Sequence, residues 1–179
     1  MRCAARANWN FGSPQRFSVI EVVPFSRNHQ AGVIELILLI QRVEFGFPIT
    51  VEDQPDLLDI PGFYQQGSGN FWVALSDGEV VGTIALRDIG NHQAALRKMF
   101  VKASYRGKEQ GVARRLLEQL LLFATSGEVR DVFLGTTDKF VAAHRFYERN
   151  GFDRIPAAAL PEAFPRMSLD TRFYHRKLG

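Results

Sequence analysis

Cysteine is nearly absent from this chain of 179 residues, since Cys3 is the only one. A single cysteine excludes an intrachain disulfide. Long apolar runs are also missing, because residues 33–40 form the longest, Glu35 interrupts it, and a membrane-spanning helix needs ~20 residues. No apolar stretch typical of a signal peptide follows Arg2 and Arg6. We therefore expect a cytoplasmic protein with no membrane partner.

An excess of one charge is lacking too, because 22 Lys and Arg against 19 Asp and Glu leave a net charge of only +3. A nucleic-acid-binding protein would show a basic stripe. Here the basic residues are scattered, apart from residues 97–108 and 172–177. We therefore expect a small anionic ligand and no nucleic acid. The four histidines show no spacing typical of ligands, so no metal site is predicted.

The composition, 46% hydrophobic and 23% charged, is typical of a globular domain. Residues 1–16 show little periodicity and are expected to form a loose N-terminal extension, with one domain over residues 17–179. Apolar runs rich in β-formers alternate with segments of helical spacing, which is typical of an α/β (α+β) fold. The predicted strands are residues 17–23, 71–75, 80–86, 96–101, 131–137 and 172–177, and the predicted helices are residues 27–45, 53–60, 111–124 and 139–150.

Turn chemistry adds detail to this order. Asp53 is expected to cap the short second helix, and Pro61 with Gly62 to end it. The loop 63–70, with Tyr64 exposed in it, is expected to shape specificity. Residues 76–79 (SDGE) predict a hairpin turn, and a glycine within the next strand, Gly82, marks a close approach of backbone or ligand. A strand, a long helix and a strand over residues 96–137 predict a parallel pair.

The rest of the chain is organised around residues 96–124, where a strand leads into a basic loop and then an amphipathic helix. Amides at a helix N-terminus have no partner within the helix, and the helix dipole is positive there, so such an end favours anions. Arg106 and Lys108 add charge, while Gly107 and Gly111 let the backbone approach a bulky group. This stretch therefore predicts a phosphate or pyrophosphate site.

Two motifs, LRKMFVKASYRGKEQGVARRLL and LGTT followed by AHRFYERNGF, give residues 17–155 a resemblance to the GNAT superfamily of acyl-CoA-dependent N-acetyltransferases. The phosphate loop of that family resembles residues 108–113, with Lys108 in place of Gln or Arg. Phe140 stands where the family often has Asn. The resemblance implies a mixed, mostly antiparallel sheet of six to seven strands with a splayed central parallel pair, flanked by about four helices.

The resemblance also implies acetyl-CoA as cosubstrate. Backbone groups of Met99, Phe100 and Val101 would bind pantetheine and stabilise the oxyanion. The loop residues that would hold the pyrophosphate are Arg106, Gly107, Lys108, Glu109, Gln110, Gly111, Val112 and Ala113. Tyr147 would protonate the leaving thiolate. From spacing alone, Tyr147 also fits a core position on a helix with Ala143 and Phe140.

No general base stands out in the sequence. Asp88, His92 and Glu44 are candidates by rough position, and His144 lies three residues before Tyr147. Deprotonation through water is an equal alternative. The base therefore stays unassigned at this point.

We expect an N-acetyltransferase that moves an acetyl group to a primary amine of a small molecule or amino acid, by direct attack in a ternary complex. The alternative is a non-catalytic CoA-binding or regulatory module, which Phe140 and the missing base favour. The acceptor pocket is expected from the loop 63–70, the first two helices and the tail 160–176. Basic residues of that tail, Arg166, Arg172 and Arg176, would suit a carboxylate-bearing amine. A homodimer through the terminal strand is also considered.

Overall fold

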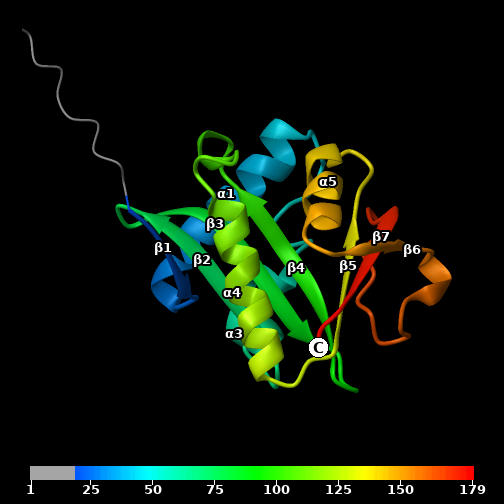
Figure 1. Cartoon of the computed structure of the whole chain (residues 1–179). Helices are drawn as coiled ribbons and strands as arrows, with labels where there is room; N and C mark the ends of the chain where they lie inside the picture. The colour runs from blue at the N-terminus through cyan, green and yellow to red at the C-terminus, as the bar shows by residue number, and fades with distance from the viewer. Residues whose placement is uncertain (1–18) are drawn as a thin grey trace, which may run out of the picture.

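A single seven-stranded sheet, in the order β1-β2-β3-β4-β5-β7-β6, forms the centre of the molecule (Figure 1). The computed structural model describes residues 19–179. The strands are β1 (Ile20–Pro24), β2 (Asn70–Ser76), β3 (Glu79–Asp88), β4 (Gln93–Val101), β5 (Asp131–Thr136), β6 (Asp153–Ile155) and β7 (Arg172–Lys177). The α-helices are α1 (Gln30–Leu38), α2 (Pro55–Leu58), α3 (Ile60–Tyr64), α4 (Val112–Ser126) and α5 (Val141–Arg149).

Strands β1 to β4 form an antiparallel meander, as the sequence predicts. The β2–β3 turn has positive φ at Asp77 (49°) and Gly78 (83°). Two successive positive φ values belong to the turn whose twist matches the flanking strands, and Asp-Gly is the preferred sequence for it. The hairpin prediction is therefore confirmed. The expected extension, residues 1–16, and the first residues of the expected first strand, Phe17 and Ser18, lie outside the described part of the chain.

One parallel contact joins the two halves of the sheet. Only Gln93–Ala95 of β4 pair with Asp131–Phe133 of β5, after which the two strands separate toward the top of Figure 1. Strand β5 instead pairs along its whole length with β7, which runs antiparallel to it. The predicted mixed sheet with a splayed central parallel pair is confirmed.

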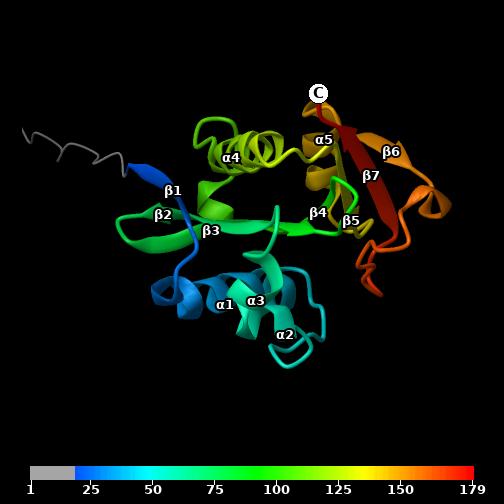
Figure 2. The same ribbon diagram turned by 90° about the horizontal axis from the view of Figure 1, so that it is seen from below.

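Helices cover both faces of the sheet, with α4 and α5 on one face and α1, α2 and α3 on the other (Figure 2). Gly82 explains how closely α4 approaches, because a Cβ there would lie 3.0 Å from Leu116 Cδ1 and 3.1 Å from Val112 Cγ1. The close approach that Gly82 predicts is therefore that of a helix against the sheet.

The first helical segment is longer and less regular than a plain α-helix. A 3₁₀ turn, Arg27–His29, precedes α1, and a π-helical segment, Leu39–Glu44, follows it. Together these three segments occupy nearly the whole predicted range 27–45. Val33 and Ile37 of α1 are fully buried against the sheet, so tertiary packing of one apolar face holds the segment.

The prediction that Pro61 and Gly62 end a helix is wrong, because both lie inside α3. Asp59 caps this helix by accepting a hydrogen bond from the Gly62 amide (3.2 Å). Proline in a first turn loses no intrahelical hydrogen bond, so it begins this helix. Asp53 does not cap α2 either, since its Oδ2 accepts from the Thr50 amide (2.9 Å).

Three further differences concern strands and exposure. Tyr64 is 2% exposed, so the prediction that it faces solvent is wrong. Strand β6 has only three residues and was not predicted. Strand β7 lies between β5 and β6, so Phe173–His175 have partners on both sides and leave no free edge there for a second copy. Within residues 19–179, no helix is both long and apolar enough to cross a lipid bilayer.

Candidate active site

A bulge interrupts β4 where the strand leaves β5. Arg97 pairs with Ala85 and Phe100 pairs with Thr83, so two residues of β4 lie opposite one residue of β3. Lys98 takes a positive φ of 50° at this point. Its carbonyl accepts a hydrogen bond from Thr83 Oγ1 (2.7 Å), which holds the bulge in place. Bulges bend a strand and re-aim side chains, which explains the opening between β4 and β5.

A cavity of about 120 Å³ lies at this opening. Its walls come from β4, from the end of β5, from α5 and from the loop before β7. The lining residues are Gln41, Phe47, Ile49, Gln54, Leu96, Arg97, Lys98, Met99, Phe100, Gly135, Thr136, Thr137, Phe140, Ala143, Tyr147, Met167, Leu169 and Asp170. Met99, Phe100 and Tyr147, all expected from the sequence, therefore meet at one cavity.

The predicted anion loop and Val101 lie beyond this lining, where β4 continues toward α4. Gly111 is the N-cap of α4 with a φ of 63°, and no side chain of residues 19–179 caps this end of the helix. Gly107 has a φ of 102°, and a Cβ there would have no atom of the described residues within 4 Å. The Gly111 amide donates to the Gly107 carbonyl (3.2 Å) and closes the loop. Open space and uncapped amides fit an anion at this helix end.

Arg106, although part of that loop, contacts protein groups. Its guanidinium makes two hydrogen bonds to the Glu44 carboxylate, one of them 2.7 Å long. Its Nε donates to the Val101 carbonyl (2.7 Å). The hydrogen bond from Arg106 lowers the pKa of Glu44, which makes this carboxylate a weaker base. Arg106 thus ties the loop to the π-helical segment.

The other candidate bases also bind protein groups, and none of them lines the cavity. Asp88 accepts from the Ser68 and Gly90 amides, both at 2.8 Å. His92 Nδ1 lies 3.0 Å from the Glu128 carbonyl. The buried His144 has its Nε2 2.9 Å from the Thr137 carbonyl. These contacts hold turns and the start of α5.

Tyr147 satisfies both of its sequence interpretations. It is 5% exposed, and its ring packs edge-to-face on Phe152 at 5.6 Å between centroids. It also lines the cavity, and its hydroxyl has no hydrogen-bond partner among residues 19–179. Burial raises the pKa of Tyr147, and Asp170 and Tyr174 raise it further. The phenol therefore keeps its proton throughout the physiological pH range.

A buried polar network that the sequence did not predict surrounds Lys98. Its Nζ lies 3.1 Å from Asp56 Oδ2 and donates to Gln54 Oε1 (2.7 Å). The Tyr64 hydroxyl donates to the same Asp56 oxygen. Gln54 Nε2 donates to Gln41 Oε1 (2.9 Å). Burial lowers the pKa of Lys98, and Asp56 opposes that shift. The network ties the β4 bulge to α2 and α3.

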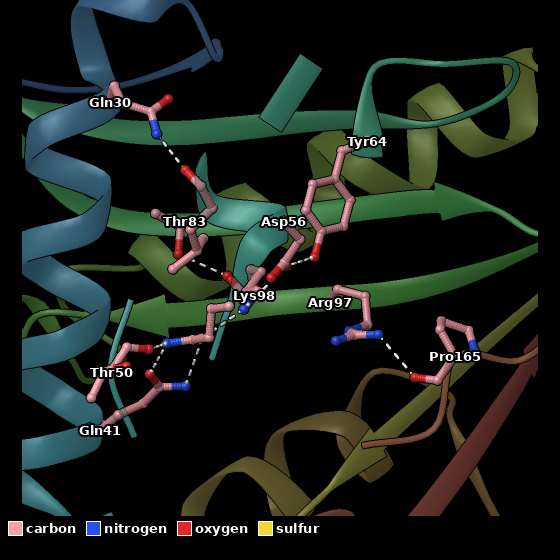
Figure 3. Close-up of polar contacts among 11 residues, drawn as sticks. Gln30, Gln41, Thr50, Asp56, Tyr64, Thr83, Arg97, Lys98 and Pro165 are labelled. Atoms are coloured by element: carbon pink, nitrogen blue, oxygen red, sulfur yellow. Dashed lines mark hydrogen bonds and ion pairs between the residues drawn. The ribbon is translucent and has the colours of Figure 1, made fainter. Parts of the chain in front are cut away.

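Arg97 points away from this network, as Figure 3 shows, and its Nη1 donates to the Pro165 carbonyl (2.9 Å). The Arg166 guanidinium lies 5.0 Å from the centroid of the Phe173 ring. Arg176 instead donates to the Asn150 carbonyl (2.5 Å) and lies over Phe152. Arg97 and Arg166 both interact electrostatically with Asp170. Arg166 is therefore the basic tail residue that shares a neighbour with Arg97.

Asp170, which the sequence did not single out, is mostly buried against Gly135 in the cavity wall. A Cβ on Gly135 would lie 2.4 Å from Asp170 Oδ2. The same oxygen accepts from the Met167 amide (3.0 Å). Burial raises the pKa of Asp170, while the Met167 amide, Arg97 and Arg166 oppose that shift.

Phe140, which departs from the family pattern, has aromatic partners. Its ring lies 4.5 Å from that of Phe45, 5.9 Å from that of Phe47 and 6.5 Å from that of Phe100, all edge-to-face. The departure is thus matched by an aromatic cluster beside the cavity. Among the described residues, no group of three or more His, Cys, Asp or Glu is placed to hold a metal ion.

Comparison with known proteins agrees with this geometry. The family described as acetyltransferase (GNAT) domain matches residues 67–154. An acetyltransferase of the GNAT family from Staphylococcus aureus Mu50 is 38% identical, covers 90% of this chain and 100% of its own, and superimposes with a TM-score of 0.86. The chain therefore belongs to the GNAT family of acetyltransferases.

Curated relatives are longer proteins. N-acetylaspartate synthetase from Xenopus tropicalis is 40% identical over 104 residues, which are 56% of this chain and 37% of that protein. The chain thus matches only about a third of that relative's length. The PaiA N-acetyltransferase from Thermoplasma acidophilum, solved in complex with coenzyme A, shares the fold with a TM-score of 0.67 at 17% identity, covering 89% of this chain and 99% of its own.

Proposed function

We propose that this protein transfers the acetyl group of acetyl-CoA to the primary amine of a small molecule or amino acid. The observation that carries the proposal is the gap between β4 and β5, which pair at only three positions and then enclose a cavity containing Tyr147. A gap of this kind offers unpaired strand backbone on one side and a polar reacting group on the other.

The residues of this chain fit acetyl-CoA along that gap. The backbone of Met99, Phe100 and Val101 follows the bulge and would bind the pantetheine arm as an added strand. An amide among them would stabilise the oxyanion. The pyrophosphate would lie on the uncapped amides of residues 112 and 113 and on the loop 106–110. The Thermoplasma protein, which has the same fold, was solved in complex with coenzyme A, and this supports coenzyme A as the ligand.

Tyr147 would act as the general acid. The leaving thiolate needs a proton, and a phenol that stays protonated and has no competing hydrogen bond can supply it. The amine would attack the thioester directly, with both substrates bound. A cytoplasmic location and a homodimer stay predictions.

The acceptor is proposed to carry a carboxylate. Arg97 lines the cavity, and Arg166 lies close enough to Asp170 in the cavity wall to affect its pKa, so two guanidinium groups lie near one end of the site. Guanidinium groups bind carboxylates with paired hydrogen bonds. The curated relatives named N-acetylaspartate synthetase support this choice. Arg172 and Arg176 are not proposed to bind the acceptor carboxylate, because Arg176 binds Asn150 and Arg172 contacts Tyr174.

The test follows free thiol release from acetyl-CoA with a panel of amines: L-aspartate, L-glutamate and other amino acids, their amides, and spermidine. We expect turnover of amino acids and weaker turnover of the amides. Calorimetric binding of acetyl-CoA without thiol release on any amine would favour the non-catalytic module instead. Strong activity on spermidine with none on amino acids would contradict a carboxylate-bearing acceptor.

A further inference from the structure

The cavity contains four side chains that can hold or release a proton within the described chain: Arg97, Lys98, Tyr147 and Asp170. Arg97 carries a guanidinium group, which donates hydrogen bonds and has no acceptor. Lys98 Nζ already binds Asp56 and Gln54, so a substrate would have to compete with both partners for it. Tyr147 holds its proton, because burial raises its pKa. Asp170 is the one carboxylate in the lining, and so the candidate to accept a proton.

The position of Asp170 is tightly determined. Oδ2 accepts from the Met167 amide, and the Asp170 amide donates to the Met167 carbonyl (3.1 Å), so the two residues close a turn. The carboxylate packs on Gly135, where any other residue would place a Cβ at 2.4 Å from Oδ2. Gly135 lies on β5 beyond its last pair with β4, on the wall of the gap. Oδ1 has no hydrogen-bond partner among residues 19–179.

We propose that Asp170 is the general base that removes a proton from the ammonium group of the acceptor. This assignment rests on the proposed acetyl transfer. In the first step, an N–H bond of the ammonium breaks and its proton passes to Asp170 Oδ1. The freed lone pair then attacks the thioester carbon. When the C–S bond breaks, the sulfur takes the proton of Tyr147, and the tyrosinate recovers one from the new amide nitrogen. Asp170 then releases its proton to solvent.

The surroundings of Asp170 suit an amino-acid acceptor. The charged and titratable groups that interact with it electrostatically are Arg97 from β4, Arg166 from its own loop and Tyr147 from α5. An ammonium group would be drawn to the carboxylate, while a substrate carboxylate would be drawn to the two guanidinium groups. Burial raises the pKa of Asp170, which makes it a stronger base, while the Met167 amide, Arg97 and Arg166 oppose that shift.

The experiment compares Asp170→Asn with the wild type, and uses Asp153→Asn on β6, an exposed position, as the matched control. Asn retains an oxygen for the Met167 amide, so the turn is preserved. Each protein is assayed with the fastest amine of the panel and with hydroxylamine, whose nitrogen is already unprotonated at neutral pH. Calorimetry with acetyl-CoA reports whether the cosubstrate site is intact.

With the panel amine we expect Asp170→Asn to lower kcat by about 100-fold or more, the range for loss of a general base. The acid limb of the pH profile should disappear. Hydroxylamine turnover, acetyl-CoA affinity and the Asp153→Asn control should stay near wild type. Equal losses with both nucleophiles, or an unchanged acid limb, would overturn the assignment of Asp170 alone. A wild type that turns over no amine, hydroxylamine included, would overturn the proposed function as well.

Discussion

Gly135 and Asp170 lie so close that a Cβ on the glycine would come within 2.4 Å of the carboxylate oxygen Oδ2. The backbone of Gly135 is not in the left-handed region, so the glycine is needed here for space. The contact joins β5, beside the gap, to the loop that precedes β7. The absence of one side chain on β5 therefore sets the position of a charged group in the cavity.

Gly135→Ala should displace that carboxylate and lower kcat with the panel amine by about 10- to 100-fold, since small misplacements of a reacting group are costly. Gly127→Ala is the control, because a Cβ there meets only ordinary contacts, the nearest at 3.5 Å from the Phe123 carbonyl. Steady-state kinetics measures kcat of both variants, and circular dichroism verifies that both are folded. Equal activity of the two variants would contradict the expectation.

Tyr147→Phe should lower kcat by about tenfold or more while KM for acetyl-CoA changes little, because only the proton donor is lost. Stability should change little, since the hydroxyl has no hydrogen-bond partner among the described residues. Tyr174→Phe is the matched control, because its hydroxyl bonds Glu148 (3.1 Å) outside the cavity. An unaltered kcat for Tyr147→Phe would exclude Tyr147 as the acid.

Arg97→Gln should raise KM for an amino-acid acceptor by about tenfold, because a hydrogen bond to a charged group contributes about 1.5–3 kcal/mol. The KM for the corresponding amide should change much less. Arg176→Gln provides the control, since that guanidinium binds Asn150 instead. If KM rises equally for the amide and for the amino acid, Arg97 does not bind the carboxylate of the acceptor.

Lys98→Met should destabilise the fold by about 3–5 kcal/mol, because it leaves Asp56 buried without its charge partner. The Lys98 side chain is 5% exposed and that of Asp56 is 14% exposed. Lys102→Met removes the lysine of an exposed pair with Glu79 and should cost far less. Urea unfolding measures both free energies. Similar losses in the two variants would show that the buried pair contributes little.

Asp170→Asn should stabilise the protein at neutral pH. The folded state holds the Asp170 proton more tightly than the unfolded chain does, because burial raises its pKa. Its contribution to stability is therefore full below the pKa of an unfolded Asp, about 3.9, and is lost as the pH rises through the folded-state pKa. The Tm advantage of the variant should thus grow from pH 4 to pH 8. A Tm difference that shrinks over this range would contradict the sign.

The elements that the sequence predicted have local signals. Asp77-Gly78 specifies its turn through backbone preference, and Gly111 begins α4 where the loop ends. Strand β6, at three residues, is too short to show an alternation. The prediction for Pro61 and Gly62 is wrong because proline and glycine occur at either end of a helix. The cap from Asp59 places both residues at the start of α3.

Only part of the candidate site could be predicted from the sequence. Met99, Phe100 and Tyr147 belong to recurring motifs, so they could be named in advance. Lys98 is charged, and no sequence pattern predicts that it will be buried at a bulge beside Asp56. Asp170 meets Gly135, which lies 35 positions earlier in the chain (170 − 135), through a loop without periodicity. Such a contact follows from tertiary packing alone.

The bulge at Lys98 also protects the sheet from its own strands. Beyond Ala95 the side of β4 that faces β5 has no strand partner among residues 19–179, and such unpaired edges invite a neighbouring strand to add on. A bulge and inward charges blunt an edge of this kind, and β4 carries both at Arg97 and Lys98. The gap between β4 and β5 therefore resists closure by β5 and β-strand addition from a second molecule. It stays open for a ligand that brings its own hydrogen-bonding groups.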